Sequence, residues 1–169
     1  EEGTAELDAV EIDPEIFRIG EAKHPDRPYS NPNVDVHIDD GRAFMERSEG
    51  DYDMIIFALP DSLTLVSGQS ALRLESFLFT EEAVTKARDL LAPGGVLTFY
   101  NYYREEWLID RLARTLEEVF GTTPCVEVVG NAGGLATLMV STDEEAINCP
   151  SQALARDTET APAPVTDDR

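Results

Sequence analysis

The sequence predicts an α/β domain in which helices cover both faces of a mostly parallel, doubly wound sheet. Strand-like and helix-like segments alternate along the chain, and an apolar strand ends in acidic residues just before a helix-starting proline. Two final apolar runs, residues 125–129 and 136–141, are separated by a glycine-rich turn. This last pattern predicts an antiparallel hairpin at the C-terminal side of the sheet.

The first two strands are expected at 7–12 and 34–38. A short helix over 15–22 follows the first, because Pro14 suits the first turn of a helix. Asp39 and Asp40 can cap a second helix over 41–45. The later elements are expected to be a strand buried on both faces at 52–58, a helix at 80–91, a strand at 96–101 and an amphipathic helix with apolar residues Trp107, Leu108, Leu112, Leu116, Val119 and Phe120.

The chain is strongly acidic: 34 acidic residues against 13 basic ones give a net charge of −21 over 169 residues. Such a field repels phosphate backbones, so we expect no nucleic-acid partner, and it attracts cations such as polyamines. The alternative is that the acidic surplus only keeps the surface soluble or salt-tolerant. Residues beyond Thr142 are poor in apolar side chains, which predicts a folded domain over 1–142 and a disordered acidic tail over 143–169.

The cysteines and histidines are few and scattered. Cys125 and Cys149 form no CxxC pair, and His24 and His37 are the only histidines. We therefore expect neither a disulfide framework nor a metal centre, and a reducing, cytoplasmic location. No apolar run approaches the roughly 18 residues of a membrane span, and nothing resembles a signal peptide.

Glu11 is the first candidate site residue. In a doubly wound domain, an acid at the carboxyl end of the second strand accepts hydrogen bonds from a ribose diol. The alternative for Glu11 is a solvated strand end with no ligand. Nucleotide-binding domains of this type begin with a strand and a glycine-rich turn, and only residues 1–6 precede this strand. We expect a fragment that lacks this first unit and binds nucleosides weakly on its own.

An ordered set of motifs resembles the spermidine/spermine synthase family, which has the Rossmann-like class I S-adenosylmethionine-dependent methyltransferase fold. The motifs are Val10-Glu11-Ile12-Asp13-Pro14, Asp39-Asp40-Gly41-Arg42-Ala43-Phe44, Tyr52-Asp53-Met54-Ile55-Ile56, Leu78-Phe79-Thr80 and Pro93-Gly94-Gly95-Val96. The resemblance covers roughly residues 7–122. The loop 61–80 looks like that of synthase-like domains fused behind membrane segments, which implies a membrane-tethered parent protein, and the family implies a homodimer.

The resemblance implies a nucleoside site. Glu11 would hold the ribose hydroxyls of S-adenosylmethionine or its decarboxylated form, and Ile12 would provide an apolar face for adenine. Asp40 would accept from the adenine amino group beside the Gly41 backbone, with helix capping as the alternative role. Ala58 is also expected to line this site.

The family reaction belongs to polyamine biosynthesis: it transfers an aminopropyl group to a cationic amine such as putrescine and needs no metal. In the family, two aspartates three residues apart bind the amine and accept its proton. Asp61 matches the second aspartate, but Ala58 occupies the position of the first, the expected base. Glu75, on a loop expected to act as a lid, and Tyr100 are further candidates for binding the amine.

Three functional hypotheses follow. The first is a spermidine synthase-like transferase, and the second is an S-adenosylmethionine-dependent methyltransferase on the same fold. The third is a non-catalytic module that binds a nucleoside or a polyamine, which the absence of the base at Ala58 favours.

Overall fold

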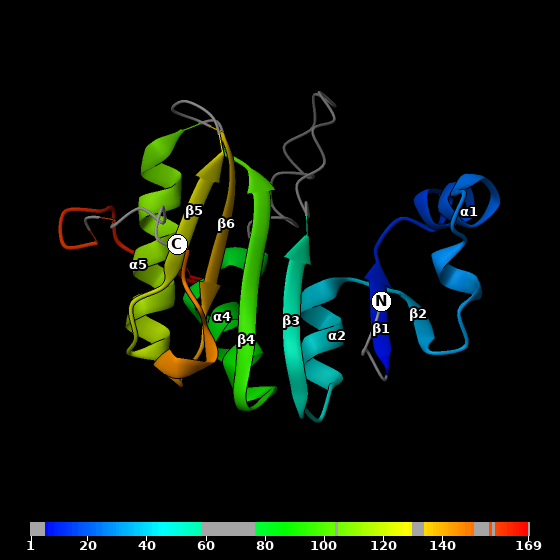
Figure 1. Ribbon diagram of the computed structural model, residues 1–169, viewed down its shortest axis with the longest axis horizontal. Helices are drawn as coiled ribbons and strands as arrows, with labels where there is room; N and C mark the ends of the chain where they lie inside the picture. Colours follow the sequence, from blue (N-terminus) through cyan, green and yellow to red (C-terminus); the bar gives the residue numbers. More distant parts are fainter. Residues whose placement is uncertain are drawn as a thin grey trace. The chain divides into compact units, whose positions relative to one another are not determined.

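The computed structural model describes residues 6–58, 77–103, 105–129, 134–150, 156 and 158–168. The chain divides into two compact units, Glu1–Ser48 and Glu49–Arg169, and each unit has its own sheet (Figure 1). Among the residues described, none of the helices has the length and apolar composition of a bilayer-spanning segment.

The first unit is a parallel strand pair with a helix after each strand. Its elements are β1 (Leu7–Glu11), α1 (Pro14–Lys23), the 3-10 turn η1 (Pro28–Ser30), β2 (Val34–Ile38) and α2 (Gly41–Arg47). Pro14 is the first residue of α1, and the Asp13 carboxylate accepts the Glu15 amide at 2.8 Å. The strand–helix alternation expected here is confirmed, with boundaries shifted by one or two residues.

The second unit contains the expected hairpin. Its elements are β3 (Tyr52–Ala58), η2 (Phe77–Phe79), α4 (Glu81–Asp89), β4 (Leu91–Tyr102), α5 (Glu106–Phe120), β5 (Cys125–Val129), β6 (Leu135–Val140) and η3 (Glu144–Ala146). The sheet order is β3-β4-β6-β5. β3 and β4 are parallel, whereas β6 is antiparallel to both β4 and β5. The predicted α/β class is confirmed.

One face of the four-stranded sheet forms the core of the second unit, where α4 and α5 contact the strands and each other (Figure 1). The buried side chains of this face are Phe57, Leu97, Phe99, Val126, Ala136, Leu138 and Val140. The rings of Phe57 and Phe99 stack with centroids 5.1 Å apart, and Phe79 meets Phe99 edge-on at 5.5 Å. The residues leading into α4 are therefore packed into the core.

The expectation that β3 is buried on both faces is wrong for this unit. Met54 and Ile56 are 52% and 54% exposed, whereas Phe57, which points to the other face, is 9% exposed. Among the described residues β3 pairs on one edge only, with β4, and no helix of its unit covers the face of Met54. An apolar sequence alone cannot reveal whether both faces of a strand have a packing partner.

The glycine-rich turn expected between α4 and the next strand is built into β4 itself. The pairing of β3 with β4 shifts register between Tyr52 and Met54 at this point. Gly94 has a φ of 79°, and a Cβ on Gly95 would lie 2.8 Å from the Tyr52 carbonyl oxygen. Glycine alone tolerates both the positive φ and the close contact. Because the register shift accommodates this turn within the strand, β4 begins at Leu91 and not at the expected Val96.

Helix α5 presents an apolar face to the core, but Trp107 is not part of that face. Its side chain is 47% exposed and lies under the Arg111 guanidinium, 5.0 Å from the ring centroid. Ile109, which the sequence analysis did not include, is fully buried. Gly121 ends the helix in the left-handed conformation with a φ of 73°.

The described part of the C-terminal segment contacts α5, where the sequence analysis expects a disordered tail. Arg156 Nε donates to Asp110 Oδ1 at 2.5 Å, and Arg114 Nη1 donates to the carbonyl oxygen of Ala161 at 2.7 Å. Ala161 is 7% exposed. Hydrogen bonds of this kind hold the described part of the segment beside α5, and the expected division of the chain at residue 142 stays a prediction.

Replacing Thr80 by alanine is expected to lower the free energy of unfolding by about 1–2 kcal/mol. Thr80 is the N-cap of α4: its Oγ1 accepts the Ala83 amide at 3.3 Å and donates to Asp167 Oδ1 at 2.7 Å. Thr80→Ser keeps the hydroxyl and serves as the control. Urea unfolding measures both variants, and an alanine variant as stable as the serine variant would contradict this role.

Candidate functional site

Two acidic residues of the first unit lie at the same edge of the β1–β2 sheet. Glu11, the last residue of β1, is paired with Ile38, the last residue of β2. The amide of Asp39 donates to the Glu11 carbonyl oxygen at 3.0 Å, and Asp40 follows directly. Parallel strands bring their carboxyl ends to one edge, so Glu11 and Asp40 flank the same strand ends.

The Glu11 side chain is held by the turn that follows β1. Its Oε1 accepts the backbone amide of Asp13 at 2.8 Å. Ile12, between these two residues, is 54% exposed. The turn therefore presents a carboxylate and an adjacent apolar side chain at the sheet edge, the two group types needed to bind a ribose and the face of a purine ring.

Asp40 caps helix α2. Its Oδ1 accepts the Ala43 amide at 2.9 Å, and Gly41 is the first residue of the helix. This bond establishes the capping role that the sequence analysis kept as an alternative. Capping uses Oδ1, so a second role toward a ligand would fall to Oδ2 of the half-buried side chain.

The other candidates belong to the second unit. Ala58 is the last residue of β3; it is exposed and paired with Tyr100 of β4, which is 36% exposed. Ala58 and Tyr100 thus lie side by side at the carboxyl ends of two parallel strands. Asp61 and Glu75 lie outside the described residues.

Tyr103 directly follows β4, but its environment differs from that of Tyr100. Tyr103 is 3% exposed, and its hydroxyl has no hydrogen-bond partner in the described part of the chain. Burial raises the pKa of the Tyr103 phenol well above its usual value of 10.0. This phenol is consequently unsuited to proton transfer near neutral pH.

Replacing Tyr103 by phenylalanine is expected to raise the free energy of unfolding by about 1 kcal/mol, because it removes a hydroxyl that is buried without a hydrogen-bond partner among the described residues.

The stability of the native protein should also depend on pH. Above pH 10 the free energy of unfolding should fall by about 1.4 kcal/mol per pH unit, since only the phenol of the unfolded chain ionises there. The phenylalanine variant lacks this loss. Urea titrations near neutral pH and above pH 10 test both effects, and parallel stability curves would contradict the assignment.

The structure contains a disulfide, where the cysteine spacing predicts no disulfide framework. A disulfide joins Cys125, at the start of β5, to Cys149, with Cα atoms 5.7 Å apart. A sequence separation of 24 hides this proximity, because β6 runs antiparallel to β5 and returns the chain. The expected reducing, cytoplasmic location stays a prediction.

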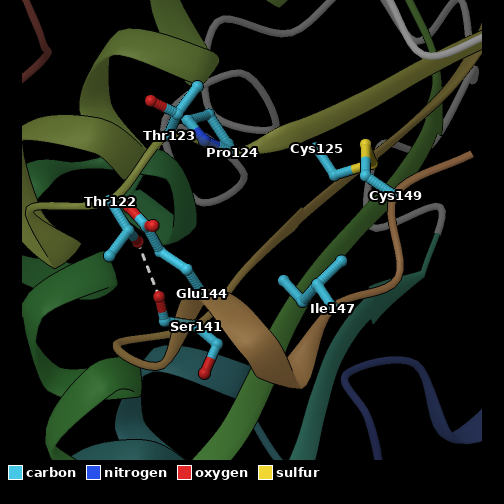
Figure 2. A pocket seen from close by; sticks show the side chains of 8 residues that line it. All are labelled: Thr122, Thr123, Pro124, Cys125, Ser141, Glu144, Ile147 and Cys149. Carbon is cyan, nitrogen blue, oxygen red and sulfur yellow. Dashed lines mark hydrogen bonds between the residues drawn. A yellow bond between two sulfur atoms is a disulfide. The ribbon is translucent and has the colours of Figure 1, made fainter. Parts of the chain in front are cut away.

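A cavity of about 390 Å³ lies beside this disulfide (Figure 2). Its lining residues are Thr122, Thr123, Pro124, Cys125, Ser141, Glu144, Ile147 and Cys149. Thr122 Oγ1 donates to the Ser141 carbonyl oxygen at 2.6 Å across it. None of the expected site residues that the structure describes is among these lining residues.

A spermine/spermidine synthase domain model matches residues 4–150, most of the chain. The chain belongs to the spermine/spermidine synthase family. It is also similar to the polyamine aminopropyltransferase of Nitrosomonas europaea, with 29% identity over 143 residues that cover 82% of this chain and 40% of that protein. The chain thus spans about two fifths of the length of this curated relative.

Solved structures with low sequence identity share the fold of this family member. A spermidine synthase in complex with the transition-state analogue AdoDATO superposes with a TM-score of 0.67 at 18% identity, covering 87% of this chain and 50% of that one. Human methyltransferase-like protein 13 in complex with SAH gives 0.61 at 22% identity, covering 89% and 64%. The Rossmann-like, class I methyltransferase-like fold predicted from the sequence is confirmed.

Within this synthase family fold, the candidate residues occupy two strand ends. Glu11, Ile12, Asp40 and Gly41 lie at the edge of the first unit, whereas Ala58 and Tyr100 lie at that of the second. In open α/β sheets, ligands bind outside the carboxyl ends of the strands. The positions expected from the motifs therefore lie where such folds hold their ligands.

Proposed function

We propose that this chain is the nucleoside-binding part of an aminopropyltransferase-like enzyme. The observation that supports it most directly is the match to the spermine/spermidine synthase family together with Glu11 and Asp40 at one sheet edge. The co-substrate is an S-adenosyl nucleoside, decarboxylated S-adenosylmethionine, and the acceptor is a small cationic amine such as putrescine.

The nucleoside is bound through the strand-end carboxylates. Glu11 accepts hydrogen bonds from both ribose hydroxyls, and a carboxylate makes these bonds charge-assisted and therefore about twice as strong as neutral ones. Ile12 contacts the adenine face. The Asp40 Oδ2 accepts from the adenine amino group while Oδ1 continues to cap α2.

The reaction forms a bond between the amine nitrogen and the aminopropyl carbon attached to the sulfonium. The carbon–sulfur bond breaks, its electron pair stays on sulfur, and the products are methylthioadenosine and the alkylated amine. The nitrogen loses one proton, which a carboxylate must accept. Asp61 is the carboxylate proposed to bind the amine, with Glu75 and Tyr100 as further contacts.

Ala58 favours a second candidate function, an S-adenosylmethionine-dependent methyltransferase. A methyl side chain at the end of β3 cannot accept a proton, so an acceptor that is already deprotonated or otherwise activated fits this site better than an ammonium ion does. A non-catalytic nucleoside- or polyamine-binding module is the third candidate for the same reason.

The deciding experiment offers the protein putrescine with either decarboxylated or ordinary S-adenosylmethionine and measures the nucleoside products by chromatography. Methylthioadenosine formed from the decarboxylated co-substrate supports the aminopropyltransferase. Methyl transfer to an acceptor, with S-adenosylhomocysteine as the product, would replace that proposal by the methyltransferase. Binding of the nucleoside without any product would leave the non-catalytic module.

A further inference from the structure

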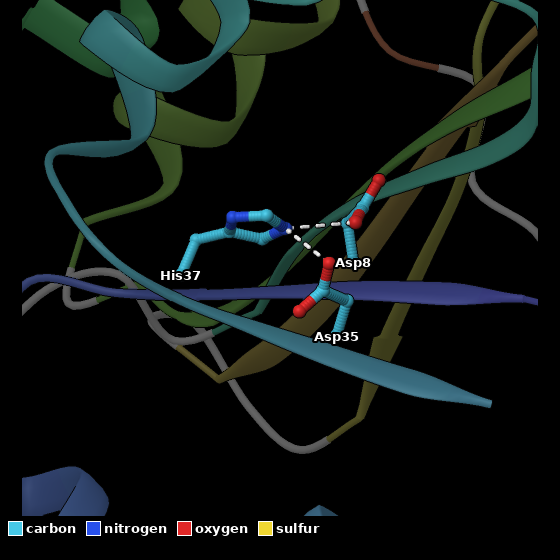
Figure 3. Close-up of side chains that lie close together, drawn as sticks. All are labelled: Asp8, Asp35 and His37. Carbon is cyan, nitrogen blue, oxygen red and sulfur yellow. Dashed lines mark hydrogen bonds and ion pairs between the residues drawn. The ribbon is translucent and has the colours of Figure 1, made fainter. Parts of the chain in front are cut away.

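Three potential metal-ligand side chains meet on one face of the β1–β2 sheet (Figure 3). Asp8 and Asp35 are directly opposite each other in the parallel register, and His37 lies two residues beyond Asp35 on the same face. The ligand atoms of these three residues all lie within 4.8 Å of one another. The site is separate from Glu11, which ends β1 three residues after Asp8.

The spacing of the three side chains suits one small cation. The His37 Nε2 lies 2.9 Å from Asp8 Oδ1 and 3.8 Å from Asp35 Oδ2. Zinc bonds of about 2.0–2.2 Å in tetrahedral geometry separate neighbouring ligand atoms by about 3.3–3.6 Å. The two His37 distances lie on either side of that range, and all the ligand atoms lie within 4.8 Å of one another, so small side-chain rotations suffice to approach this geometry.

The surroundings of the cluster suit an ion from solvent. Two of the three ligands are carboxylates on neighbouring strands of a chain with a net charge of −21, which attracts cations. The His37 ring packs against Phe44 of α2, with centroids 4.7 Å apart, which restricts the orientation of the imidazole. The side chains of His37 and Asp8 are 32% and 33% exposed, so an ion from solvent can reach them.

We propose that Asp8, Asp35 and His37 bind a divalent first-row transition metal ion such as Zn²⁺. One imidazole nitrogen with two carboxylates suits zinc and its neighbours, whereas Mg²⁺ and Ca²⁺ prefer oxygen ligands alone. Three protein ligands leave a fourth position for water. The ion joins β1 to β2 and neutralises their opposed carboxylates.

Calorimetric titration of the protein with ZnCl₂ at about pH 7.5, where an ordinary imidazole is mostly neutral, tests the proposal. We expect one Zn²⁺ per chain and little heat from MgCl₂. His37→Gln and Asp8→Asn should each weaken zinc binding at least about tenfold, because each removes one of three ligands. His24→Gln is the matched control: His24 also lies near an aspartate, 4.0 Å from Asp26, but outside the cluster, and this variant should bind zinc like the native protein.

Imidazole ¹⁵N NMR provides a second measurement that identifies the ligand atom. Addition of Zn²⁺ should shift the Nε2 resonance of His37 and leave that of His24 unchanged. Circular dichroism checks that each variant is folded before titration. Equal zinc affinity of the His37→Gln and His24→Gln variants, or an unchanged His37 resonance, would overturn the proposal and leave His37 as an ordinary hydrogen-bond partner of Asp8.

Discussion

Replacing Ala58 by aspartate is expected to raise the rate of aminopropyl transfer by about two to four orders of magnitude, the usual contribution of a positioned general base. Ala58 is exposed at the end of β3, beside Tyr100 of β4. A longer polar side chain at this position therefore does not enter the packed core. The introduced carboxylate would accept the proton that the attacking nitrogen must lose.

Ala58→Asn is the matched control, because asparagine has nearly the same shape as aspartate but cannot act as a base near neutral pH. Methylthioadenosine formation from decarboxylated S-adenosylmethionine and putrescine is measured for the native protein and both variants. A rate increase in the aspartate variant alone supports the assignment of the position. Equal rates in the two variants would show that a base at residue 58 has no access to the reacting amine.

Replacing Glu11 by glutamine should weaken S-adenosyl nucleoside binding by about 10- to 100-fold. Two charge-assisted hydrogen bonds to the ribose become neutral ones, a loss of about 1–3 kcal/mol in total. The glutamine carbonyl oxygen can still accept the Asp13 amide that Glu11 Oε1 binds at 2.8 Å, so the turn after β1 should persist. Equilibrium dialysis with labelled nucleoside gives the dissociation constants.

The ribose contact itself is tested with a 2′-deoxy analogue of the same nucleoside. The native protein should bind the analogue more weakly than the parent compound, and the Glu11→Gln variant should discriminate less between the two. Glu21→Gln, an exposed position on α1, controls for the general loss of one negative charge. Equal weakening by both substitutions would mean that Glu11 acts only through the overall field of this acidic chain.

Local sequence patterns were sufficient to predict most of the elements. The strands β2 and β3 and the hairpin strand β5 have the predicted boundaries, because period-two alternation, apolar runs and glycine turns are properties of neighbouring residues. The predicted capping residue Asp40 is equally local, since its side chain binds the Ala43 amide three residues away. The positions of Glu11 and Asp40 at strand ends follow directly from these boundaries.

Several features depended on contacts between distant residues and could not be predicted in this way. The apolar residues of β3 are the same whether one face or both are covered, so the exposure of Met54 depends on its tertiary neighbours. The C-terminal segment is held through Asp110, Arg114 and Thr80, none of which its own composition reveals. The burial of Tyr103, unlike Tyr100, likewise depends on what packs around it.

The amino-acid order by itself determined the α/β class, the strand-end acids and the family resemblance, since these depend on residues close together in the chain. Only the tertiary structure decided that Cys125 meets Cys149 and that Asp8 faces Asp35 beside His37. The two cysteines, and likewise Asp8 and Asp35, are separated by more than 20 residues in the chain, and strand register places Asp8 opposite Asp35. Register is a property of paired strands, which no single segment specifies.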